Sequence, residues 1–193
     1  MRRSPLRYQA SEYDCGPVAV VNAISCICDF SDIPPAFLKA VYEITLDKCN
    51  VTGHVGREGT SKEAMEFMAS WINQYNEKTG FPHIHCRVVT GNAVSFKEGS
   101  ALLEEVKRED VVVLLFCRMY NSHYVVVTDC SDKYLYLFDS YDWDIDFEDD
   151  RIHRVNEPYC ANRKLPIGFI DDNKGIYYTI RDMDKFAIVF EKI

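Results

Sequence analysis

Apolar residues lie at helical spacing in the first half of the chain. From Pro17 to about Cys28 almost every position is apolar, and a run without a polar stripe predicts a helix that is buried on all sides. Pro17 suits the first turn of this helix, where its missing N–H has no intrahelical partner to lose. Further helices are expected from Pro35 to about Leu46, after Thr60, and at 101–108.

The helix after Thr60 has the clearest pattern. Thr60 and Glu63 form a capping box, in which each side chain bonds to the backbone N–H of the other residue. The apolar residues that follow recur every three or four positions, so they are expected to face the core. They are Ala64, Phe67, Met68, Trp71, Ile72 and Tyr75.

The second half of the chain changes to short runs of β-branched and aromatic residues separated by turn residues. These runs predict strands, whereas the acidic stretch at 140–175 has little periodicity and is expected to be a long loop. Helices before strands, without alternation of the two, favour an α+β fold with a mainly antiparallel sheet. The strands are expected at 111–116, 123–128, 134–138, 176–180 and 186–191, with a further candidate at 86–89.

Length and charge narrow the class of protein. The chain has 193 residues, of which 47% are hydrophobic, and we expect one domain over 1–193, with a helical half to about 110 and a sheet half from 111. The net charge is −8, and no run of Lys or Arg is longer than Arg2-Arg3. Nucleic acid is therefore not an expected partner, because binding it requires a basic face.

Targeting segments are not expected. No stretch reaches the about 18 apolar residues of a membrane span, and the N-terminal segment lacks the apolar centre of a signal peptide. The chain is therefore expected to be cytoplasmic and its eight cysteines to be reduced thiols. The pattern says nothing about the oligomeric state.

Cys15 stands at the start of the buried helix, in YQASEYDCGPVAVVNAI. It is either a small buried core residue or a nucleophile. A thiol at a helix N-terminus lies at the positive end of the helix dipole, which favours the thiolate. Asp14, directly before it, is expected to cap the helix through its carboxylate.

A nucleophilic cysteine requires a base and a group that orients the base. His123 begins a strong strand in NSHYVVVTD, and Asp139 ends the next one in YLYLFDSY. A symmetric hairpin centred on residue 131 would place the two directly opposite each other, with Cβ atoms about 5 Å apart. The carboxylate would then fix the tautomer of the imidazole and support the imidazolium.

Attack on a carbonyl also requires donors for the oxyanion. The backbone N–H of Cys15 and the side-chain amide of Gln9, six residues upstream, meet this need. Gly16 lets backbone and substrate approach closely. Together, Gln9, Cys15, His123 and Asp139 favour a catalytic thiol over a structural one.

These residues resemble the cysteine peptidases that process bacteriocin leader peptides at double-glycine sites, a family of the papain-like superfamily. The resemblance rests on QASEYDCG before a helix, HYVVV, an aspartate sixteen residues after the histidine, and REGTSKEAM at 57–65; it covers about 8–141. It implies a papain-like fold in which the Cys helix packs on an antiparallel sheet carrying His and Asp. It also implies residue roles: Cys15 as nucleophile, His123 as general base and acid, Asp139 as orienting group and Gln9 as oxyanion donor. Ser140 stands where that family commonly has proline.

The expected activity is therefore that of a thiol hydrolase, foremost a peptidase, that forms a thioester acyl-enzyme with a peptide or protein substrate. An acyl or peptidyl transferase on the same triad and a catalytically idle peptide-binding module are the alternatives. Gly16, Ser122 and Tyr124 are expected to contact the substrate. No cofactor is expected, and no metal, since HIHC at 83–86 has no cysteine pair at zinc-ribbon spacing.

One acidic segment has two interpretations. It contains Trp143 together with Asp142, Asp144 and Asp146. It either lines a substrate groove or forms a solvated loop whose tryptophan packs on the sheet, and the second is favoured.

Overall fold

Helices and one antiparallel sheet make up the chain, as the sequence predicts. The computed structural model describes residues 5–143, 145 and 147–193. The α-helices of this part are α1 (Cys15–Ile27), α2 (Pro35–Thr45), α3 (Lys62–Thr79) and α4 (Ala101–Val106). Its strands are β1 (Ile84–Thr90), β2 (Val111–Met119), β3 (Asn121–Cys130), β4 (Tyr134–Phe138), β5 (His153–Glu157), β6 (Ala161–Pro166), β7 (Tyr177–Thr179) and β8 (Phe186–Lys192). The α+β class is confirmed.

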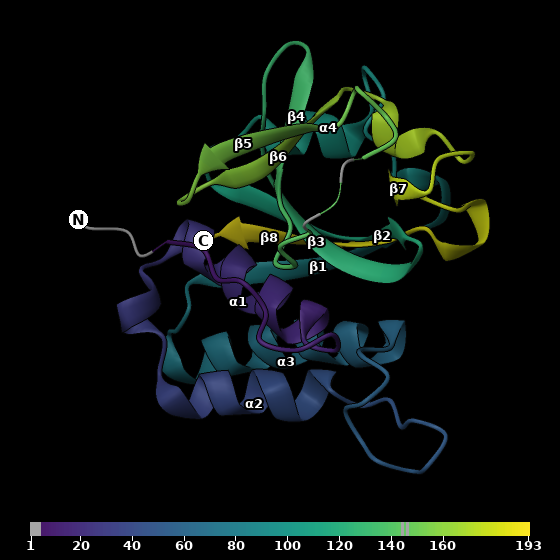
Figure 1. Cartoon of the computed structure of the whole chain (residues 1–193). Helices are drawn as coiled ribbons and strands as arrows, with labels where there is room; N and C mark the ends of the chain where they lie inside the picture. Colours follow the sequence, from purple (N-terminus) through teal and green to yellow (C-terminus); the bar gives the residue numbers. More distant parts are fainter. Residues whose placement is uncertain (1–4, 144, 146) are drawn as a thin grey trace.

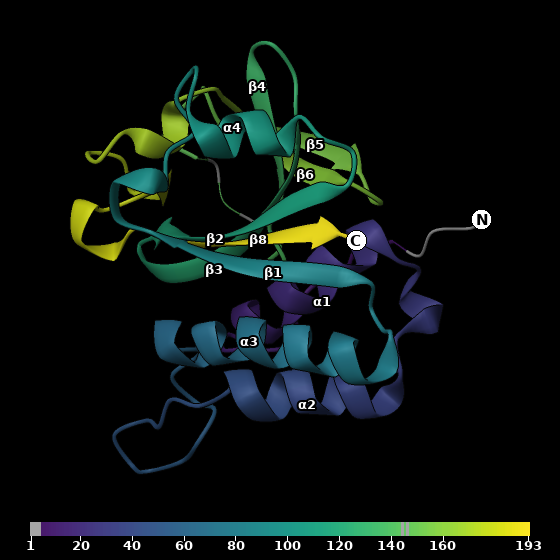
Figure 2. The same cartoon turned by 180° about the vertical axis from the view of Figure 1, so that it is seen from behind.

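The sheet order is β1-β8-β2-β3-β4-β6-β5, with β7 paired to β2, and every pairing is antiparallel. Helices α1, α2 and α3 cover one face, below the sheet in Figure 1, where α1 contacts β2 and β3 and α3 contacts β1. On the other face, α4 and the curved part of the sheet formed by β4, β5 and β6 enclose a second core (Figure 2).

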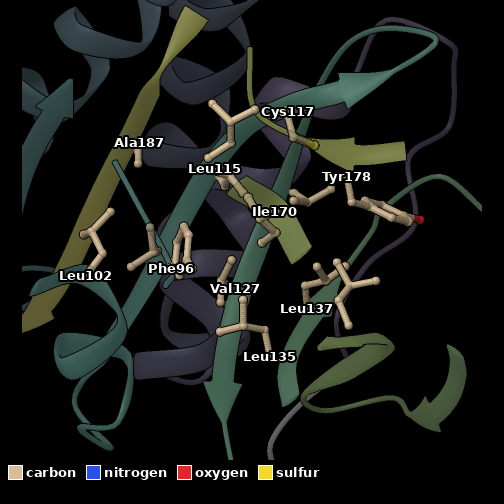
Figure 3. Close-up of a cluster of buried hydrophobic side chains, with 14 of the residues drawn as sticks. Phe96, Leu102, Leu115, Cys117, Val127, Leu135, Leu137, Ile170, Tyr178 and Ala187 are labelled. Atoms are coloured by element: carbon tan, nitrogen blue, oxygen red, sulfur yellow. The ribbon is translucent and has the colours of Figure 1, made fainter. Parts of the chain in front are cut away.

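Strand β2 is buried on both faces, which explains its continuous apolar sequence. Val112 and Leu114 point to the helical layer, whereas Val113 and Leu115 belong to the core on the opposite face. Figure 3 shows this opposite core, with Leu115 on β2 and Val127 on β3.

Helix α1 is the central helix that its sequence predicts. Residues Cys15 through Ser25 are all buried, so the helix has no solvent-facing stripe. It packs on β2 and β3, and β3 carries the candidate catalytic residue His123. Since the thiol of Cys15 stands at the first residue of α1, packing of the helix fixes the thiol relative to the sheet.

The start of α3 differs from the prediction. Ser61 is the N-cap, and its hydroxyl accepts a hydrogen bond of 3.0 Å from the N–H of Ala64. The predicted N-cap at Thr60 is therefore wrong by one residue, and the predicted capping box is wrong because the third helical residue is Ala64 rather than Glu63. Thr60 is instead buried, since its side chain packs against α1 beside Gly16.

The apolar stripe of α3 is also narrower than predicted. Phe67 is 60% exposed and does not belong to the core. The helix turns its Met65–Met68–Ile72 face to the sheet, and Phe67 lies too far around the helix axis to reach it. Met65, which the stripe omitted, is fully buried.

The segment 140–175 is not an uninterrupted loop. It contains the hairpin β5–β6, and β6 pairs with β4 to extend the sheet. The sequence gives only a weak strand signal here because no residue of β5 is fully buried, whereas Ala161, Asn162 and Arg163 of β6 are buried although two of them are polar. None of the helices in the described ranges is both long and apolar enough to cross a membrane.

Candidate active site

Cys15 is a free thiol at the first position of α1, with 8% of its surface exposed. Asp14 occupies the N-cap position, but its side chain makes no cap hydrogen bond. Its carboxylate instead accepts bonds from the hydroxyl of Ser11 and the N–H of Ala10, so the predicted capping role of Asp14 is wrong. The first N–H groups of α1 therefore keep their positive potential, which favours a thiolate at Cys15.

His123 and Asp139 are in direct contact, with 2.7 Å between His123 Nε2 and Asp139 Oδ1. The predicted hairpin register, however, is wrong. Val126 faces Phe138 and Val127 faces Leu137, and an irregularity after Val127 shifts the pairing by one residue near the turn. In this register His123 and Asp139 are diagonal neighbours on one face, which is still close enough for their side chains to meet.

The carboxylate of Asp139 is completely buried and accepts three hydrogen bonds. Oδ1 accepts from His123 and from the N–H of Tyr141 at 2.9 Å, and Oδ2 accepts from the hydroxyl of Tyr178 at 2.8 Å. Asn162 holds the backbone on both sides of the residue, at 2.8 and 2.7 Å. Each carboxylate oxygen therefore has a donor, and the carboxylate cannot rotate freely.

Tyr178 and Asn162 were not anticipated from the sequence. They lie 39 and 23 residues after Asp139, in segments whose pattern carries no catalytic signal. Only the pairing of β6 with β4 and of β7 with β2 brings them to the site.

The imidazole of His123 and the backbone N–H of Tyr124 act on the thiol of Cys15, and both lower its pKa. Because Nε2 of His123 is bonded to Asp139, Nδ1 is the ring nitrogen left for the thiol. Cys15, His123 and Asp139 thus form one row of side chains, with His123 between the thiol and the carboxylate.

The electrostatics of this row favour its charged form. Burial by itself favours a neutral thiol, but the hydrogen bond and positive charge of His123 outweigh it and lower the pKa of Cys15. Burial likewise opposes the imidazolium, yet Asp139 and Cys15 raise the pKa of His123 to about 10. Asp139 is buried too, and the charge and hydrogen bond of His123 keep the pKa of its carboxyl below the usual value. A thiolate–imidazolium pair is the state these shifts support.

Other thiols have the opposite environment. Burial raises the pKa of Cys28 to about 11, and burial also raises the pKa of Cys86 and Cys117. These thiols lack a cationic partner strong enough to compensate for lost solvation. Cys15 therefore differs from them in electrostatics and not merely in position.

Gln9 has a fixed side-chain amide. Its Oε1 accepts a 2.8 Å bond from the hydroxyl of Ser140, and its Nε2 donates a 2.7 Å bond to the backbone carbonyl of Ser11. A carbonyl only accepts, so the Ser11 contact determines which end of the amide is nitrogen. One Nε2 hydrogen remains for another acceptor.

A cleft of about 650 Å³ opens over the thiol. Gln9, Cys15 and His123 line it, and so do Ser122 and Tyr124. The remaining lining residues are Glu12, Tyr13, Lys48, Glu58, Gly59, Thr60, Phe116, Met119, Asn121, Tyr141 and Trp143.

Gly16 is not among the residues that line the cleft. It is buried, and a Cβ at this position would overlap the side chain of Thr60. The close approach that this glycine permits is thus between α1 and Thr60 rather than between backbone and substrate.

Trp143 agrees in part with each of the two interpretations of its segment. Its ring packs against the core enclosed by α4 and the curved part of the sheet, and it also lines the cleft. It lies edge to face with His123, with ring centroids 6.4 Å apart, and close to Tyr141 at 4.3 Å. Asp144 and Asp146 lie outside the described residues.

In the ranges 5–143, 145 and 147–193, no three His, Cys, Asp or Glu side chains are grouped so that they could hold a metal ion. In the HIHC segment, Cys86 is buried among apolar side chains of the helical layer, whereas His83 and His85 are exposed. The segment therefore does not present its three side chains to one point.

The chain has a distant structural likeness to known proteins. No family model and no curated protein matches it. One similar solved structure is described as the crystal structure of a double glycine motif protease from AMS/PCAT transporter in complex with the leader peptide. The two chains are 13% identical, the match covers 98% of this chain and 91% of the other, and the TM-score is 0.48. At this level the likeness by itself carries no argument about activity.

Proposed function

We propose that the chain is a papain-like cysteine hydrolase that acts as a peptidase on a peptide or protein substrate. The observation that carries the proposal is that Cys15 and His123 line one large cleft, where His123 is hydrogen-bonded to Asp139 and lowers the pKa of the thiol. A buried structural cysteine would not require a charged partner, and burial would raise its pKa.

The reaction begins with attack of the Cys15 thiolate on the carbonyl carbon of the scissile amide. A carbon–sulfur bond forms, and the carbonyl π electrons move to oxygen. The N–H of Cys15, which has no intrahelical acceptor, and the remaining Nε2 hydrogen of Gln9 are the donors we assign to this oxyanion.

His123 then transfers its proton to the leaving nitrogen, and the carbon–nitrogen bond breaks to leave a thioester on Cys15. In the second half, a water molecule loses a proton to His123 and attacks the thioester carbonyl. The carbon–sulfur bond breaks, releasing the acid and restoring the thiolate–imidazolium pair. Asp139 keeps the imidazole oriented throughout, because its three hydrogen bonds prevent rotation of the carboxylate.

The cleft supports a peptide as substrate. It is about 650 Å³ and is lined by aromatic rings together with hydroxyl and amide groups. Such a mixture suits an extended segment with polar backbone and varied side chains. The resemblance of the Cys15 and His123 motifs to bacteriocin-processing peptidases makes peptides with a double-glycine site the first to test.

A peptide-library digest analysed by mass spectrometry tests the proposal, with Cys15→Ala as the inactive variant and Cys49→Ala as its matched control at an exposed thiol. We expect wild type and Cys49→Ala to cleave the same peptides and Cys15→Ala to cleave none. Cleavage that survives in Cys15→Ala overturns the proposal. Products extended by an added amine identify a transferase, and no conversion by any protein identifies a binding module.

A further inference from the structure

A second, smaller pocket adjoins the cleft. It has a volume of about 140 Å³ and lies where the β2–β3 turn meets the segment Arg181–Asp184. Phe116, Asn121 and Ser122 line both the pocket and the cleft. A substrate in the cleft can therefore extend a group into this pocket.

Two arginines give the pocket a positive charge although the whole chain carries −8. Neither Arg118 nor Arg181 has a carboxylate within ion-pair distance in the described part of the chain. The acidic residue of the pocket, Asp184, is already paired at 3.1 Å with Lys62. Two guanidinium charges are thus left uncompensated beside the cleft.

The guanidinium of Arg118 also has an unused donor. Its Nη1 donates to the carbonyl of Gly175 at 3.2 Å, whereas its Nε is buried and has no hydrogen-bond partner. A buried donor of a charged group is costly when it is left unpaired. With Nη1 occupied and Nε buried, Nη2 is the donor of Arg118 that remains for an oxygen of a carboxylate in the pocket.

We propose that this pocket binds a carboxylate of the substrate, so that the enzyme prefers an acidic group close to the bond attacked by Cys15. The inference rests on the proposed function. The carboxylate comes from an Asp or Glu side chain or from the C-terminus of a peptide, and both present the same two oxygens. Elsewhere the cleft carries Glu12 and Glu58 against Lys48, which leaves the arginine pocket as the favoured place for an anion.

Protection of Cys15 from iodoacetamide measures this preference without a known substrate. Hexapeptide pools carry either Glu or Gln at one fixed position and end either as a free acid or as an amide. Alkylation at Cys15 is mapped by mass spectrometry, and the readout is the peptide concentration that halves its rate. We expect Glu pools to protect at about tenfold lower concentration than Gln pools at one or two positions. The same advantage for free acids over amides would identify a terminal carboxylate instead.

Two variants and one control assign the preference to the pocket. Arg118→Gln and the exposed Arg181→Gln should each remove most of the Glu or free-acid advantage. Arg87→Gln, which changes the net charge equally at an arginine paired with Glu105, should keep it. Equal protection by charged and neutral pools in wild type, or an advantage that persists in both pocket variants, overturns the inference. If Cys15 reacts no faster than the other thiols, the proposed function fails and the inference falls with it.

Discussion

The hydroxyl of Tyr178 donates a 2.8 Å hydrogen bond to Oδ2 of Asp139, on the carboxylate oxygen that His123 does not use. Tyr178 has φ of 53°, in the left-handed region that non-glycine residues rarely adopt. Figure 3 shows its ring at the edge of the core, with the hydroxyl directed away from the cluster. Tertiary packing thus holds the backbone of Tyr178 in a strained conformation, and the hydroxyl of the same residue holds the carboxylate of Asp139.

Tyr178→Phe should therefore weaken both the fold and the site. We expect a loss of about 1.5–3 kcal/mol in the free energy of unfolding, because a buried carboxylate loses a donor. Turnover should fall as well, since Asp139 can then rotate. Urea unfolding and peptide hydrolysis measure the two effects, and Tyr177→Phe is the matched control, because its hydroxyl bonds to Tyr120 instead. A Tyr178→Phe protein indistinguishable from Tyr177→Phe would contradict the assignment.

The reactivity of Cys15 should depend on His123. The lowered pKa of Cys15 predicts alkylation that becomes fast below the ordinary thiol range, and the pKa of about 10 for His123 predicts that the imidazolium partner of the thiolate persists until about that pH. In His123→Ala the main opposition to burial is lost, and only the N–H of Tyr124 still lowers the pKa of Cys15, so the midpoint of the profile should rise. Near pH 6–7 the rate should then drop about tenfold for each unit of the rise.

Iodoacetamide labelling from pH 5 to 10 with mass-spectrometric mapping provides the profile. His153→Ala serves as the control, since that ring packs against Tyr134 on the sheet. An equal change in His153→Ala, or an unchanged profile in His123→Ala, would show that another group sets the pKa of Cys15.

Gln9 should act only when the oxyanion forms. Gln9→Ala is expected to lower turnover about 10²–10³-fold with little change in substrate binding, since it removes a transition-state donor. Gln9→Glu should be at least as damaging, because a carboxylate neither donates to Ser11 nor tolerates a neighbouring oxyanion. Separate kcat and KM values on one peptide check this, and near-normal turnover in Gln9→Ala would remove Gln9 from the site.

Ser140 should contribute through Gln9. Its hydroxyl holds Oε1 of the amide, so Ser140→Ala is expected to lower kcat by less than Gln9→Ala does. The double variant should be no worse than Gln9→Ala alone, because residues that act through one contact are not additive. Ser131→Ala, at an exposed serine, is the control. Additive losses in the double variant would mean that Ser140 acts independently of Gln9.

Asp139→Asn should retain more activity than Asp139→Ala. The amide oxygen of asparagine can still accept from His123 and Tyr141, and its nitrogen can donate to the hydroxyl of Tyr178. Alanine leaves the imidazole unoriented and the buried donors unpaired. Turnover of the two variants, with circular dichroism to verify folding, decides the point. Equal losses would show that His123 requires the charge of Asp139 rather than its geometry.

Local pattern in the sequence predicted the parts of this protein that depend on neighbouring residues. The uninterrupted apolar run after Cys15 predicted a helix buried on all sides, and α1 is buried from Cys15 to Ser25. The apolar runs at 111–116 and 123–128 predicted strands, and these strands are β2 and β3. The order of Gln9, Cys15, His123 and Asp139 in the sequence also singled out residues that the fold brings together. The first three line one cleft, and Asp139 is hydrogen-bonded to His123.

Contacts between distant segments decided the rest. The pairing that shifts after Val127 makes His123 and Asp139 diagonal rather than opposite, because turn geometry sets a register that the pattern of the strands does not specify. The position of Tyr178 beside Asp139, and that of Arg118 with its buried and unbonded Nε, depend on the pairing of β7 with β2. Periodicity reports which face of an element is buried, but the identity of the residue across the interface depends on packing between segments far apart in the chain.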